Sequence, residues 1–150
     1  MKITLCGSIA FYDEMLEIKS ELEKANHEVD LPPLKVKGEN GELISVKDYY
    51  KIRKEAEKSK GNSWIWERKA EAIRSHFDKV EWADAALITN YKKNDIEGYI
   101  GANTFLEMGL AFHLGKPIYL LNPIPEMWHK EEILGMKPVV IKNDIKKILH

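Results

Sequence analysis

Two short stretches of this sequence combine the residue types that can bind an anion or transfer a proton. Gly7-Ser8-Ile9 follows an apolar run, so its backbone N–H groups and the Ser8 hydroxyl can contact an anion or a ribose. Asn103-Thr104-Phe105-Leu106-Glu107 opens an expected helix and places a carboxylate in its first turn. Each stretch also has a structural interpretation. Ser8 can cap a tight turn, and Thr104 and Glu107 can form a capping box.

A second candidate carboxylate, Asp78, lies on the helix expected before the third core strand. Arg74 stands four residues before it and Trp82 four residues after it, so the three share one stripe of the helix. The structural alternative is a solvated Arg74–Asp78 ion pair, worth only a few tenths of a kcal/mol. Asp84, directly before the strand, is a candidate ligand contact or a residue that ends the helix.

Several common types of site are not supported by the sequence. The chain has no G-x-G-x-x-G fingerprint, no phosphate-binding P-loop and no G-x-S-x-G motif. The single cysteine, Cys6, can form neither a disulfide framework nor a cysteine metal cluster. The histidines are too scattered for a metal site: His27, His76, His113, His129 and His150. We therefore expect no metal and no cofactor.

Apolar strands that alternate with amphipathic helices must position these residues. Strands are expected at 3–6, 27–31, 85–89, 118–121 and 139–141, and helices at 13–26, 46–58, 64–83, 104–114 and 126–134. This order predicts an α/β three-layer sandwich with a five-stranded, mostly parallel sheet, flavodoxin-like or Rossmann-like. Ligands of such sheets bind beyond the carboxyl ends of the strands. The site is therefore expected at Gly7-Ser8, at Asn90 and the following helix, and around Asn122.

Length and charge limit the class of protein. The 150 residues predict one domain, 1–150, with a charged excursion at about 32–63. A formal charge of −1 does not favour a nucleic-acid partner. No apolar run reaches the roughly 18 to 20 residues of a membrane span, and the N-terminus does not resemble a signal peptide. We expect a cytoplasmic protein without a membrane partner.

Three motifs, taken in their order along the chain, resemble the nucleoside 2-deoxyribosyltransferase-like family. They are Leu5-Cys6-Gly7-Ser8-Ile9, His76-Phe77-Asp78 with Trp82 and Asp84, and Glu107-Met108-Gly109. The similarity is greatest to the deoxynucleoside-monophosphate N-glycosidase branch. It covers about residues 1–31 and 74–122.

The resemblance implies an enzyme that cleaves the N-glycosidic bond of a 2-deoxynucleoside or its monophosphate, by hydrolysis or base exchange. It implies that Glu107 is the nucleophile at the anomeric carbon and that Asp78 assists proton transfer at the base. The two carboxyl groups should then lie close together, as in retaining glycosidases. The expected substrate contacts are Gly7, Ser8, Ile9, Asp84, Asn90, Gly101 and Asn103. Members of this family usually associate, so a homo-oligomer is expected, with Trp64, Trp66 and Trp128 as candidate contacts or core residues.

Departures from the family pattern leave the substrate open. Ala10-Phe11 replaces the basic, glycine-rich continuation of the phosphate-binding branch, so both nucleoside and nucleotide remain candidates. Phe105 stands where a glycine is frequent, and the longer entry at 98–103 leaves base specificity open. The alternative class is a noncatalytic nucleotide-binding or sensing domain that uses the same cleft. A third alternative is a structural subunit whose cleft is filled.

Overall fold

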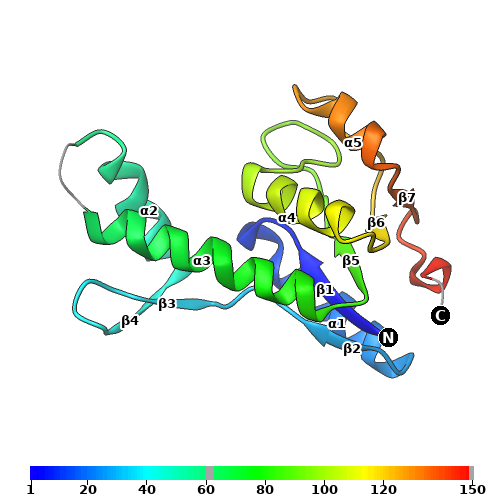
Figure 1. Ribbon diagram of the computed structural model, residues 1–150, viewed down its shortest axis with the longest axis horizontal. Helices are drawn as coiled ribbons and strands as arrows, with labels where there is room; N and C mark the ends of the chain where they lie inside the picture. Colours follow the sequence, from blue (N-terminus) through cyan, green and yellow to red (C-terminus); the bar gives the residue numbers. More distant parts are fainter. Residues whose placement is uncertain (60–62, 149–150) are drawn as a thin grey trace.

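Five parallel strands form the central sheet of the computed structural model, which describes residues 1–59 and 63–148 (Figure 1). His150 and residues 60–62 of the excursion lie outside the described residues. The strands are β1 (Lys2–Cys6), β2 (Glu28–Asp30), β5 (Ala85–Ile88), β6 (Ile118–Leu120) and β7 (Val139–Val140). Their spatial order is β2-β1-β5-β6-β7. This is the flavodoxin-like order, which reverses between β1 and β5 and places a ligand crevice at their carboxyl ends.

Helices cover both faces of the sheet, as predicted for an α/β three-layer sandwich. Neighbouring side chains on a strand point to opposite faces, so Leu5 and Cys6 belong to different parts of the core. Leu5 packs in the cluster that contains Met15 of α1 (Tyr12–Lys24). Cys6 packs in the cluster that contains Val80 of α3 (Ser63–Trp82) and Met108 of α4 (Ala102–His113). Cys6 therefore points toward the same layer as Glu107.

The remaining helices are short. A 3-10 turn, η1 (Ile9–Phe11), leads from β1 into α1, and the Ser8 hydroxyl caps it by accepting from the Ala10 N–H at 3.3 Å. The helix α5 (Lys130–Met136) precedes β7, and η2 (Ile145–Lys147) is a single 3-10 turn. None of the described helices combines the length and the hydropathy needed to cross a membrane.

The charged excursion forms a small unit beside the sheet, at the N-terminal half of α3 (Figure 1). It contains an antiparallel hairpin of β3 (Lys35–Lys37) and β4 (Leu43–Ser45), followed by α2 (Val46–Ala56). Tyr49, Ala56 and Ile65 form its buried cluster, and the Tyr49 hydroxyl donates to the Ile65 carbonyl at 2.8 Å. The sequence predicted the helix but not the hairpin. Because α3 has 20 residues, it spans about 30 Å and connects this unit to the main sheet.

The three tryptophans proposed as contacts differ in their surroundings. Trp66 and Trp128 are exposed, whereas Trp64 packs against the small cluster of the excursion. The expected homo-oligomer stays a prediction.

Candidate active site

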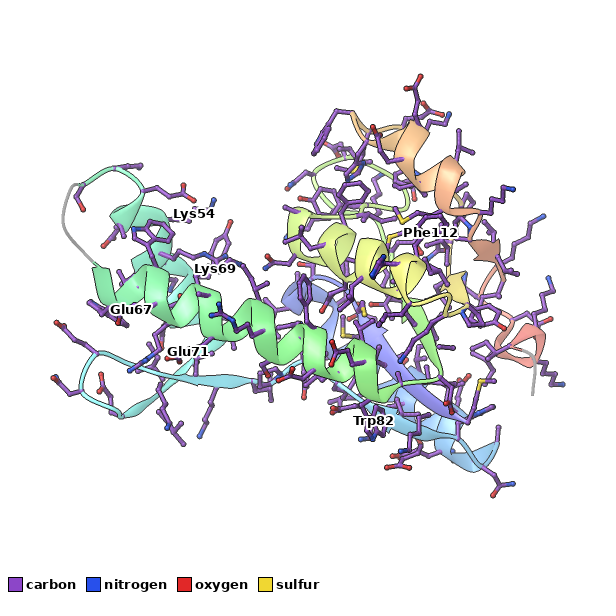
Figure 2. All side chains as sticks on the ribbon, viewed as in Figure 1. Lys54, Glu67, Lys69, Glu71, Trp82 and Phe112 are labelled. Carbon is purple, nitrogen blue, oxygen red and sulfur yellow. The ribbon has the colours of Figure 1, made fainter. Side chains whose placement is uncertain are left out.

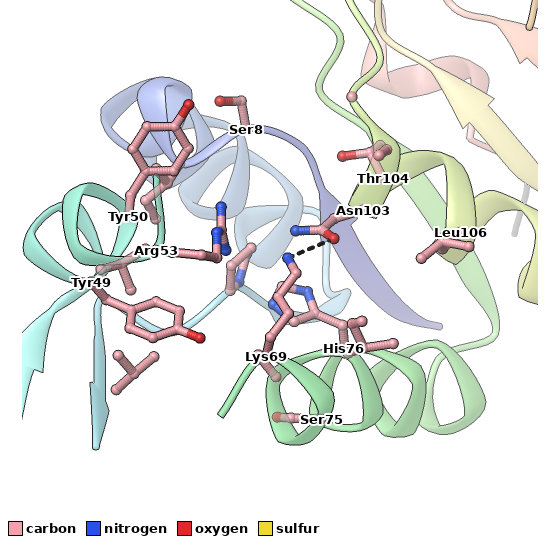
Figure 3. Close-up of a pocket in the computed structure, with 18 of the residues that line it drawn as sticks. Ser8, Tyr49, Tyr50, Arg53, Lys69, Ser75, His76, Asn103, Thr104 and Leu106 are labelled. Carbon is pink, nitrogen blue, oxygen red and sulfur yellow. Dashed lines mark hydrogen bonds between the residues drawn. The ribbon is translucent and has the colours of Figure 1, made fainter. Parts of the chain in front are cut away.

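A cavity of about 600 Å³ lies between the carboxyl edge of the sheet and the α2–α3 unit (Figure 3). The loop after β1 contributes Gly7, Ser8 and Ile9 to its wall, and α4 contributes Glu107. Tyr49, Tyr50 and Arg53 of α2 line the opposite side, together with residues of α3. This volume falls within the range of about 300–1,000 Å³ that small-molecule sites have.

Glu107 is the buried carboxylate of this cavity. It is 4% exposed, and its Oε1 lies 2.5 Å from His76 Nδ1. Helix α4 begins at Ala102 with Gly101 as its N-cap, so Glu107 is in the second turn and does not form a capping box. A carboxylate taken out of water is costly unless it is paired. The contact with His76 therefore both stabilises Glu107 and fixes its orientation.

The expectation that Asp78 shares the cleft with Glu107 is wrong. Asp78 is exposed and is not among the residues that line the cavity. His76 stands two residues earlier, which is a rotation of about 200° around the helix, so the two side chains point in nearly opposite directions. The motif His76-Phe77-Asp78 thus presents its histidine, not its carboxylate, to Glu107.

Helical periodicity explains this outcome and is also the signal that the sequence reasoning missed. Val80 packs in the core and the half-buried Ile73 lines the cavity, and His76 lies three residues after Ile73 and four before Val80. Residues with that spacing share a face. Arg74 and Asp78 fall on the adjacent stripe and are exposed.

Cys6 is a neighbour of Glu107 and is fully buried at the end of β1. Burial raises the pKa of its thiol well above the usual value, and the neighbouring Glu107 carboxylate raises it further. The thiol therefore keeps its proton at neutral pH and can donate a hydrogen bond to Glu107.

The loop after β1 passes close to the end of β5. A Cβ on Gly7 would lie 2.2 Å from Thr89 Oγ1 and 2.7 Å from Met15 Cε, so only glycine fits there without displacement. Ser8 Oγ accepts a hydrogen bond from Lys93 Nζ at 2.9 Å. Lys93 also lies over the Tyr99 ring, 5.4 Å from its centroid. The hydroxyl of Ser8 therefore holds the Lys93 ammonium group at the wall of the cavity.

Gly101 and Asn103 line the cavity at the start of α4. Asn103 Oδ1 accepts a hydrogen bond from Lys69 Nζ of α3 at 2.9 Å (Figure 3). Burial and, to a smaller extent, the nearby Arg53 guanidinium lower the pKa of Lys69 to about 8, against an opposing effect of Glu107. Lys69 and Arg53 were not singled out in the sequence, and His76 was named as part of a family motif without a catalytic role.

Asp84 and Asn90 do not line the cavity, contrary to expectation. Asp84 Oδ2 accepts from the Lys2 backbone N–H at 2.7 Å. Since Lys2 begins β1 and Asp84 precedes β5, this contact lies at the amino edge of the parallel sheet, away from the crevice. Asp84 therefore ends the helix and joins it to β1, as its structural alternative proposed.

Asn90 is 1% exposed and joins two loops at the carboxyl edge of the sheet. Its Nδ2 donates to the carbonyls of Asn122 and Pro123, at 3.0 and 3.1 Å, and its Oδ1 accepts from the Asn122 N–H at 2.9 Å. All of its amide atoms are thus used within the protein. Asn90 therefore stabilises the loops at this edge of the sheet and does not line the cavity.

Replacing Asn90 by alanine should destabilise the protein by about 2–3 kcal/mol, because several buried backbone groups lose their partners together. Urea unfolding followed by circular dichroism measures this change. Asn40→Ala, at an exposed amide between β3 and β4, is the matched control and should change stability by less than about 0.5 kcal/mol. Equal stabilities of the two variants would contradict the supporting role of Asn90.

Within residues 1–59 and 63–148, no three or more histidine, cysteine, aspartate or glutamate side chains are grouped so that they could hold a metal ion.

Two enzymes are among the solved structures that are similar to this chain. One is a 2-deoxyribosyltransferase from Bacillus psychrosaccharolyticus, with 17% identity and a TM-score of 0.49, covering 80% of this chain and 71% of that chain. The other is the CMP N-glycosidase of Clostridium botulinum, with 16% identity and a TM-score of 0.46, covering 93% of this chain and 85% of that chain. No protein-family model matches the chain, and no curated protein does. At these identities the residues of the cavity must carry the functional argument.

Proposed function

We propose that the protein cleaves the N-glycosidic bond of a 2-deoxynucleoside or a deoxynucleoside monophosphate. The observation that carries this proposal is the buried Glu107 carboxylate, which His76 orients in a cavity large enough for a nucleoside. A cleft in which a few polar groups converge is the usual form of a small-molecule site. The substrate is a small molecule.

In the proposed reaction, Glu107 acts as the nucleophile. Oε1 is held by His76, so we assign the attack on the anomeric carbon of the deoxyribose to Oε2. A bond forms between Oε2 and this carbon as the bond from the carbon to the base nitrogen breaks, and the base takes the bonding electron pair and a proton. Water or a second base then attacks the same carbon, the bond from this carbon to Oε2 breaks, and Glu107 leaves as a carboxylate. The proton lost by the attacking water or base passes to His76, which supplied the first proton. This two-step route replaces one difficult displacement by two easier ones.

His76 is the titratable side chain that contacts Glu107 in the cavity. In its protonated form, Nδ1 donates to Glu107 and Nε2 has a second proton to give to the departing base. We assign to His76 both the orientation of the nucleophile and this proton transfer, in place of Asp78. The described glutamates that also line the cavity, Glu57 and Glu71, are paired with Lys54 and Arg68.

Incubation with a panel of deoxynucleosides and their monophosphates, with and without a second free base, tests the proposal by chromatography. Release of free base alone identifies a hydrolase, and appearance of a new nucleoside identifies a transferase. Binding of these compounds without turnover would instead favour the noncatalytic nucleotide-binding domain. The absence of both binding and turnover would contradict both functions.

A further inference from the structure

The cavity has more cationic than anionic side chains. Its described glutamates other than Glu107 are neutralised, because Glu57 lies 3.1 Å from Lys54 and Glu71 lies 3.0 Å from Arg68. Four further cations line the wall: Lys37, Arg53, Lys69 and Lys93. In the part of the chain that the structure describes, no carboxylate lies within ion-pair distance of these four.

Arg53 and Lys69 face the same part of the cavity from two different helices (Figure 3). The Arg53 guanidinium lies over the rings of Tyr49 and Tyr50, 5.7 and 5.2 Å from their centroids. These aromatic faces hold the guanidinium in place while leaving its N–H donors available. Lys69 uses a donor on Asn103 and has two more. Figure 2 shows Lys54 and Lys69 on the side of α3 that faces α2, with Glu71 toward the β3–β4 hairpin.

This arrangement is costly without a bound anion. Lys69 is partly buried, and Arg53 and Lys54 from α2 oppose its charge, while Glu107 from α4 favours it. The net effect lowers its pKa to about 8. A group with two negative charges placed between Arg53 and Lys69 would relieve the repulsion and form charge-assisted hydrogen bonds with both.

We propose that Arg53 and Lys69 bind the phosphate of the substrate, so that the protein acts on a deoxynucleoside monophosphate rather than on a deoxynucleoside. This proposal rests on the proposed function. The phosphate site then comes from the α2–α3 unit and not from the loop after Ser8, where Ala10-Phe11 provides no cation. Guanidinium binds phosphate through two parallel N–H donors, and the lysine adds a point charge. The charged excursion is thus a specificity element of the cavity.

The test compares kcat/KM for a deoxynucleoside 5′-monophosphate with kcat/KM for the same deoxynucleoside. The natural sequence should prefer the monophosphate by about 10²-fold or more, as expected for two charge-assisted hydrogen bonds. Arg53→Gln and Lys69→Met should each lower this ratio by at least about 10-fold. Lys51→Met removes the same charge from an exposed position of α2 and should leave the ratio unchanged.

Titration calorimetry separates this proposal from the catalytic one. Glu107→Gln should still bind the monophosphate, and adding Arg53→Gln should weaken that binding by at least about 10-fold. At pH 8, binding should be accompanied by proton uptake, because the anion raises the pKa of Lys69 from about 8; Lys69→Met should abolish this uptake. Inorganic phosphate serves as the second probe and should compete with the monophosphate.

Two results would overturn the phosphate site. The first is equal affinity of the Glu107→Gln protein for nucleoside and monophosphate, whether or not the natural protein shows turnover. The second is loss of the phosphate preference in Lys93→Met but not in Arg53→Gln, which would move the site to the Ser8 loop. Absence of turnover with intact, Arg53-dependent binding of the monophosphate would instead contradict only the catalytic function.

Discussion

Glu107→Gln should reduce N-glycosidic bond cleavage by at least about 10³-fold, because the amide cannot act as the nucleophile. The substitution keeps the shape of the side chain and an oxygen that can accept from His76 Nδ1. The fold should therefore persist, with a change in stability of no more than about 1–3 kcal/mol, as expected for a changed buried hydrogen bond. Initial rates on an identified substrate, with thermal unfolding of the same sample, measure both quantities.

Asp78→Asn is the matched control for Glu107→Gln. It changes a carboxylate to its amide in the same way, on a side chain that is exposed outside the cavity. Its activity should stay near that of the natural sequence. A large loss in Asp78→Asn would contradict the arrangement described here and restore the role that the family resemblance implies for Asp78.

A covalent intermediate gives an independent test of Glu107. With a slowly turned-over deoxynucleoside, mass spectrometry should detect a deoxyribosyl adduct on the peptide that contains Glu107. The adduct should be absent from Glu107→Gln. An adduct on another residue in the natural sequence would assign the nucleophile elsewhere.

The sheet could be predicted from the sequence because its central strands, β1, β5 and β6, are buried on both faces. Such strands appear as short continuous apolar runs, and 85–88 and 118–120 are examples without a polar residue other than Tyr119. Parallel pairing then brings the carboxyl ends of β1 and β5 to one edge. For this reason the sequence alone predicts that Gly7-Ser8-Ile9 and Glu107 lie in the same crevice.

The orientation of side chains on α3 was predicted less well, although the information was present. Ile73 and Val80 mark the inner face, and His76 belongs to it by spacing. The family resemblance instead implied a catalytic role for Asp78. The position of each residue around the helix was the physically stronger constraint.

The structure of the α2–α3 unit could not be predicted from the sequence in the same way. The strands β3 and β4 have only three residues each, and β3 alternates Lys35, Val36 and Lys37 with no apolar run. Arg53 and Lys69 occur in helices rich in charge, where a solvated surface is the usual outcome. The two side chains line one cavity because α2 packs on α3. That packing is a tertiary contact, which the local sequence pattern does not predict.

His76→Ala should reduce kcat/KM by about 10²- to 10⁴-fold, the range associated with general acid–base catalysis. The loss combines two effects, since Glu107 loses its partner at 2.5 Å and the departing base loses its proton donor. His113→Ala, on an exposed position of α4, is the control and should retain activity. Because Glu107 is buried, His76→Ala should also lower stability by about 1–3 kcal/mol, so rates must be measured well below its unfolding temperature.

His76→Asn separates the two roles of the histidine. Asparagine can still donate a hydrogen bond to Glu107 but cannot transfer a proton, so a purely orienting histidine predicts recovery of activity in this variant. Proton transfer by His76 predicts no recovery with ordinary bases. It also predicts a much smaller loss with 7-methyl-2′-deoxyguanosine, whose cationic base departs without being protonated. Near-natural activity of His76→Ala on ordinary deoxynucleotides would show that His76 has neither role, and the second catalytic group would then have to be sought among the other polar residues that line the cavity.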